Sequence, residues 1–113
     1  MKKDLIFTSA LLLIGASLGM LHLTGMTAHI AVSVVGVLVL AVYTALTKKE
    51  WKIPALEIVM RVFYGIALIT GIVIMNVGGI PALAIAHKVS AFLFMVLIVV
   101  LLVSKIWMRK KST

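Results

Sequence analysis

Four long apolar runs dominate the sequence, and they limit the possible folds more than any other feature. The last run is the clearest, because residues 89–104 contain no charged side chain between Lys88 and Lys105. That length is close to the roughly 20 residues that an α-helix needs to cross the hydrocarbon core of a bilayer. Of the 113 residues, 64% are hydrophobic, more than a water-soluble domain of this size uses. The sequence therefore predicts an integral membrane protein.

The breaks between the runs predict where the helices begin and end. Glycine-rich or basic segments around residues 22–27, 47–52 and 76–81 separate the runs. We expect one all-α domain over residues 1–113, a four-helix transmembrane bundle built from two αα-hairpins. The predicted helices cover residues 5–23, 28–46, 55–75 and 83–107.

The first run begins like a secretory signal peptide, with basic residues before an apolar core. It is longer than the signal core of about 7–15 residues, and no polar mature region follows it, so we expect it to be retained as a helix. Two local signals help to place the next helices. Thr24 or Thr27 is suited to cap the second helix, and Pro54 is suited to the first turn of the third.

Basic residues gather at one end of the predicted bundle. The two terminal segments and the 47–52 loop, counted together with Arg61, hold all of the 11 Lys and Arg residues except Lys88. The positive-inside rule then places both termini and the central loop in the cytoplasm. We expect a protein of the prokaryotic plasma (inner) membrane. Because the net charge of +8 follows the topology, it indicates contact with the bilayer and no nucleic-acid partner.

Three histidines fall on the predicted outer side, and two of them match in position. His29 and His87 each lie in the first turn of a helix, and the two helices run in the same direction. Neutral imidazole is a good ligand for iron, copper and zinc. An ionisable residue in a membrane segment is a functional candidate by default, although an interfacial histidine often has no such role. The pair predicts a metal or cofactor site.

Small residues follow both histidines on the same helix face, which leaves room for a flat macrocycle between helices. They are Ser33 and Gly36 after His29, and Ser90 and Ala91 after His87. Small residues are also common wherever membrane helices touch, so this pattern has a purely structural reading as well. Lys88 is the one charged side chain expected outside, where it can pair with a haem propionate or an anionic lipid head group.

The pattern resembles that of four-helix membrane b-type cytochromes, such as the cytochrome b561-type proteins and the membrane subunits of formate dehydrogenases. The resemblance rests on His87 and Lys88 before small residues and a long apolar stretch, and on His29 before the basic segment 48–52. It implies one haem b near the outer face, with His29 and His87 as axial ligands. Lys88 and the four small residues would complete the cofactor-binding set.

Those families often bind a second haem through histidines further along the same two helices. Here the corresponding positions are Val42 or Tyr43 and Val100 or Leu101, so only one ligand pair is retained. The resemblance then implies an electron carrier or redox subunit, with no catalytic residues of its own. A quinol or a redox protein on the outer face would be its partner, and a bundle this small can form a homodimer.

Two other readings remain open from the residues alone. One is a non-catalytic accessory or structural membrane protein. The other is a copper-binding membrane protein, because thioether and imidazole suit Cu(I). Its ligands would come from the first outer turn and from Met75 near the second, the first set being Met20, His22, Met26 and His29.

A small transporter is a further class, since small multidrug transporters have four helices in a chain of this length. Those proteins need an acidic residue buried in the first helix, and residues 5–23 contain none. Glu57 lies near the predicted cytoplasmic edge, spaced to pair with Arg61 on one helix, and Arg61 can extend back to the surface. We therefore do not expect proton-coupled cation transport.

Overall fold

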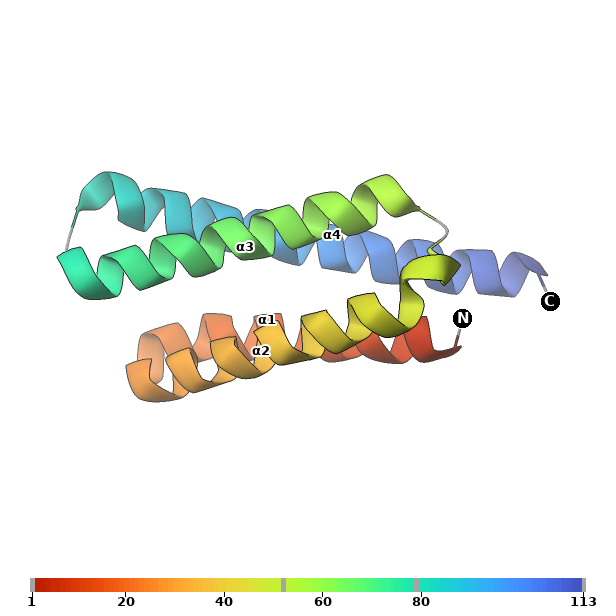
Figure 1. Cartoon of the computed structure of the whole chain (residues 1–113), viewed down its shortest axis with the longest axis horizontal. Coiled ribbons are helices and arrows are strands. Elements are labelled where there is room, and N and C mark those ends of the chain that lie inside the picture. The colour runs from red at the N-terminus through yellow and green to blue at the C-terminus, as the bar shows by residue number, and fades with distance from the viewer. Residues whose placement is uncertain (1, 52, 79, 113) are drawn as a thin grey trace.

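The chain forms four long helices in a computed structural model that describes residues 2–51, 53–78 and 80–112. Figure 1 shows their order along the chain. The elements are α1 (Lys2–Thr24), α2 (Met26–Thr47), the short 3-10 helix η1 (Lys48–Glu50), α3 (Pro54–Val77) and α4 (Pro81–Ser112). Each of the four long helices is apolar enough to cross a membrane. The predicted all-α, four-helix fold is confirmed.

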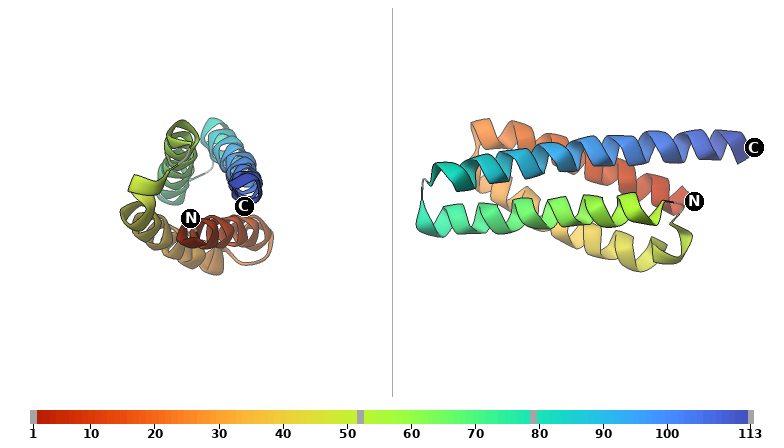
Figure 2. Two further views of the ribbon diagram at one scale, coloured as in Figure 1. Left: turned by 90° about the vertical axis from the view of Figure 1, so that its right-hand side faces the viewer. Right: turned by 90° about the horizontal axis from the view of Figure 1, so that it is seen from above.

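The helices pair as two antiparallel hairpins, α1 with α2 and α3 with α4, stacked on each other (Figures 1 and 2). Between the hairpins the closest packing joins α1 to α4, and α2 packs much less closely on α3. Both chain termini and η1 lie at one end, which we call the terminal end. The turns at Gly25 and Gly78 lie at the other end, which we call the turn end.

Local chemistry explains the helix boundaries, with one correction. Gly25 precedes α2 in an extended conformation and no side chain caps the helix, so the prediction of a Thr24 or Thr27 cap is wrong. The Thr24 hydroxyl instead donates to the Met20 carbonyl. Pro54 begins α3 as predicted, since its missing N–H costs nothing there. Gly78 ends α3 with a φ of 86°, a conformation that glycine adopts without strain.

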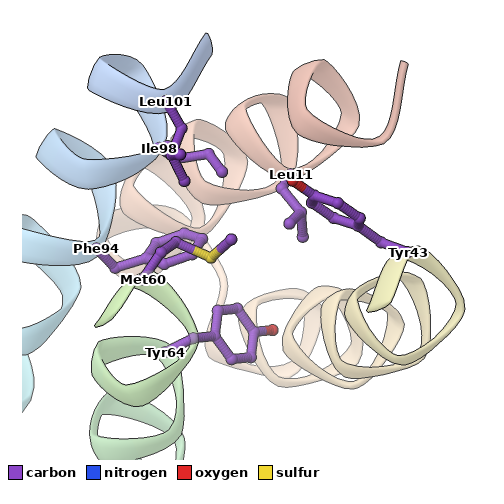
Figure 3. Packing of buried hydrophobic residues seen from close by; sticks show 7 residues of the cluster. All are labelled: Leu11, Tyr43, Met60, Tyr64, Phe94, Ile98 and Leu101. Carbon is purple, nitrogen blue, oxygen red and sulfur yellow. The ribbon is translucent and has the colours of Figure 1, made fainter. Parts of the chain in front are cut away.

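A small core lies between the two ends of the bundle and receives side chains from all four helices (Figure 3). Its members are Leu11, Tyr43, Met60, Tyr64, Phe94, Ile98 and Leu101. The rings of Tyr64 and Phe94 meet edge to face at 5.1 Å between centroids, a favourable aromatic geometry. Large apolar side chains elsewhere point outward, as expected of helices whose solvent is lipid.

Candidate functional site

A cavity of about 280 Å³ lies towards the turn end, between the two hairpins. All four helices contribute to its lining, which is mostly apolar. Five of the residues predicted to bind a cofactor line it: His29, Ser33, His87, Lys88 and Ala91. Helices far apart in the sequence therefore bring most of the predicted set to one place.

The two histidine rings lie near each other, one from each hairpin. Their centroids are 6.4 Å apart, and the ring planes make an angle of 70°. A metal ion held by two imidazoles lies about 2.0–2.1 Å from each nitrogen, and each ring centre lies roughly 1.1 Å behind its nitrogen. The observed separation of the ring centres is therefore compatible with coordination of one metal ion by both imidazoles.

Hydrogen bonds to main-chain carbonyls orient both imidazoles. The Nδ1 atom of His29 lies 2.9 Å from the Leu18 carbonyl oxygen, and that of His87 lies 2.7 Å from the Ala67 carbonyl oxygen. Because a carbonyl can only accept, each Nδ1 must carry the proton, which places the lone pair of a neutral ring on Nε2. This is the arrangement found for most metal-binding histidines.

Each anchor belongs to the same hairpin as its histidine. Leu18 lies on α1 and holds His29 of α2, whereas Ala67 lies on α3 and holds His87 of α4. The Thr70 hydroxyl of α3 is a second neighbour of His87, 3.2 Å from Nδ1. A ligand that bound both rings would therefore connect the two hairpins.

Two predicted site residues lie away from the cavity lining. Gly36 is buried against the Tyr64 hydroxyl, where a Cβ atom would overlap it, so its small size admits Tyr64. That hydroxyl donates to the Ser33 carbonyl at 2.9 Å. Ser90 is 5% exposed and lies within the bundle.

Two glycines shape this region, and sequence reasoning missed the role of Gly71. A Cβ on Gly71 of α3 would lie 3.1 Å from the His87 ring, so this glycine makes room for the imidazole. A Cβ on Gly15 of α1 would overlap the Met95 sulfur, so this glycine allows α1 and α4 to approach closely. For Gly15, the Gly-x-x-x-Gly spacing with Gly19 is the sequence signal of a close helix approach.

The methionines of the copper hypothesis do not surround the cavity. Met20, Met26 and Met75 are all more than half exposed, and the His22 side chain lies outside the described part of the structure. Within the described residues, no group of three or more His, Cys, Asp or Glu side chains could hold a metal ion.

A second polar cluster lies at the terminal end and was not predicted. The Lys105 ammonium lies 2.9 Å from Asp4 Oδ1 and 3.0 Å from Glu57 Oε2. It also donates to Thr8 and Tyr43, so the cluster joins all four helices. Lys105, Asp4 and Glu57 are each at most 2% exposed. Two of the three acidic residues of the chain thus neutralise one buried lysine.

Arg61 extends this cluster towards η1. The predicted pair with Glu57 is confirmed at 3.4 Å, and Glu57 is fully buried in the first turn of α3, near the terminal end. The Arg61 guanidinium lies over the rings of Tyr43 and Trp51, at 4.6 and 4.3 Å, and its Nε donates to Thr44. Arg61 therefore binds within the bundle, where the sequence suggested that it would reach for the surface.

Comparison with protein families, curated proteins and solved structures found no match for this chain. Its function is inferred from the site alone.

Proposed function

We propose that this protein is a small membrane b-type cytochrome that binds one haem b through His29 and His87 and acts in electron transfer. The observation that carries the proposal is the pair of imidazoles from different hairpins, 6.4 Å apart. Both are oriented through Nδ1, as metal-binding histidines commonly are. His29 and His87 would hold the haem iron, and no third protein ligand would be needed.

The lining of the cavity suits a flat apolar group. Small residues from three helices, Gly15, Gly19, Ala67 and Ala91, line it together with Leu68, Phe92 and Phe94. Its volume is slightly below the range of about 300–1,000 Å³ that is usual for ligand pockets. The exposed lining residues Gly19, Lys88 and Phe92 mark where a larger macrocycle would extend out of the enclosed space.

A bound haem would supply one-electron exchange, and the protein would set its ligands, surroundings and access. The exposed Lys88 ammonium at the edge of the cavity suits a propionate carboxylate. Tyr43 and Leu101 occupy positions where a second pair of haem ligands would be needed, and both are fully buried in the core. This supports a single haem that serves a quinol or a redox protein on one face.

The surrounding assignments belong to the same proposal. We infer that the protein resides in the plasma membrane with its termini and η1 in the cytoplasm, so that the cavity faces outward. The exposed basic residues Lys3, Lys48 and Lys49 at the terminal end support this orientation. A homodimer would be compatible with the apolar outer faces, which are otherwise covered by lipid.

Visible spectra of the detergent-purified protein, oxidised and then reduced with dithionite, test the proposal. We expect a Soret band that shifts on reduction, with resolved α and β bands. His29→Ala and His87→Ala should each abolish this spectrum, and His22→Ala is the matched control that should retain it. A featureless spectrum after expression with added haem would contradict the proposal and favour an accessory membrane protein. Haem that survives both substitutions would contradict the ligand assignment.

A further inference from the structure

The exposed residues of the cavity lining lie on α1 and α4, and we infer that the cavity reaches the surface between these two helices. The exposed residues of its lining are Gly19 on α1, and Lys88 and Phe92 on α4. Phe92 is 67% exposed although it lines the cavity, so it borders both the interior and the lipid-facing surface. We propose that this opening is a lateral entrance through which a flat, apolar ligand with an anionic group passes from the bilayer to the histidines.

Two glycines one turn apart determine where α1 and α4 separate. At Gly15 the position of a Cβ atom is occupied by the Met95 sulfur, so the two helices are in close contact there. At Gly19 nothing lies within 4 Å of the Cβ position. Residues four apart lie on the same helix face. On this face of α1, Gly15 therefore lies at the contact with α4, and Gly19 lies at the opening. Because Gly19 has no side chain, the gap between α1 and α4 stays open there, and a larger side chain would protrude into it.

The chemistry of the opening selects the class of ligand. Phe92 offers an apolar surface to the body of a ligand, and Lys88 offers a cation one helical turn closer to the turn end. A molecule with an apolar plate and a carboxylate would place the plate at the depth of Phe92 and the carboxylate beside Lys88. Haem b has this form. The identity of the ligand rests on the proposed function, whereas the entrance itself rests on the geometry of α1 and α4.

Filling the opening tests whether the ligand uses it. We expect Gly19→Leu to lower haem occupancy severalfold after expression with added haem, and Gly19→Ala to have a much smaller effect. The matched control is Gly65→Leu, because Gly65 of α3 also has nothing within 4 Å of its Cβ position and does not line the cavity. Equal occupancy in Gly19→Leu and Gly65→Leu would overturn the proposal.

A thiol probe tests the entrance without haem. The chain has no cysteine, so Ala91→Cys places a single thiol in the cavity lining. We expect N-phenylmaleimide, which dissolves in the bilayer, to label this thiol in proteoliposomes. Adding Gly19→Leu should slow the labelling severalfold, and adding Gly65→Leu should not. Ala45→Cys, on an exposed position of α2, reports the reactivity of the reagent in the membrane.

The two experiments separate the two proposals. Gly19-dependent labelling in a protein that shows no haem spectrum would support the entrance and contradict the cytochrome. A haem spectrum, together with a labelling rate that Gly19→Leu does not change, would support the cytochrome and overturn the entrance.

Discussion

The two histidine side chains have similar anchors but different surroundings. The Nδ1 atom of His29 lies beside the Leu18 carbonyl, and that of His87 lies beside both the Ala67 carbonyl and the Thr70 hydroxyl. A stronger acceptor at Nδ1 makes an imidazole a more electron-rich ligand. Thr70 is therefore a positioning residue that acts on the proposed haem through His87.

Replacing Thr70 tests this role. We expect Thr70→Val to retain haem, since the Ala67 carbonyl still holds the ring, but to raise the midpoint potential because His87 becomes a weaker donor. Redox titration of the α band measures the shift, and Thr70→Ser, which keeps the hydroxyl, should return the potential towards that of the unchanged protein. If Val and Ser variants have the same potential, the carbonyl alone sets the electronic character of His87.

The contacts between the two hairpins differ between the two ends of the bundle. At the terminal end, Lys105 of α4 contacts Asp4 of α1 and Glu57 of α3, and Tyr43 of α2 donates to the same glutamate. At the turn end, each histidine is held within its own hairpin. Buried ion pairs of this kind are costly to break, because removing one partner leaves a charge without compensation.

Lys105→Met should therefore destabilise the bundle strongly, by about 3–5 kcal/mol, because it leaves two buried carboxylates without their ammonium partner. Thermal or SDS unfolding in detergent measures this change. Lys49→Met, at an exposed position of η1, is the control and should have little effect. Adding Asp4→Asn to Lys105→Met should restore part of the stability, because Glu57 still has Arg61 as a partner. A mild effect of Lys105→Met alone would show that the cluster contributes little.

The whole molecule is a narrow bundle of 50 × 23 × 22 Å, with polar clusters at different depths along its long axis. The terminal end carries the exposed basic residues and the buried ion pairs, and the turn end carries the histidine cavity. If the basic end is cytoplasmic, the cavity opens into the outer leaflet. The orientation of the bundle thus decides which partners can reach the proposed haem.

Reporter fusions test this orientation. We expect green fluorescent protein fused after Thr113 to fluoresce, because that end would be cytoplasmic by the positive-inside rule. Alkaline phosphatase inserted at the Gly78 turn should be active, since it folds only outside the cytoplasm. The opposite pattern would place the cavity on the cytoplasmic side and exclude an outer-face partner.

Hydropathy alone predicted the four helices and their approximate bounds, because bilayer crossing depends on the length and composition of a segment and little on its neighbours. The depth of His29 and His87 followed from the same reasoning. Pro54 and Gly78 marked a helix start and a helix end through local backbone chemistry. The α4 helix continues to Ser112, past the predicted end at residue 107, since nothing in the basic tail interrupts it.

The tertiary structure decided how the helices are rotated and which of them are neighbours. An almost uniformly apolar helix has no polar stripe to show which face turns inward, so the sequence could not reveal that Lys105 meets Asp4 and Glu57. The sequence also could not show that Gly36 packs against the Tyr64 hydroxyl, or that Gly19 lies at the cavity opening. Those outcomes depend on close packing between side chains distant in sequence, which only the assembled bundle fixes. The sequence by itself determined a membrane bundle with two histidines at one predicted depth, and packing between the hairpins brought their rings together.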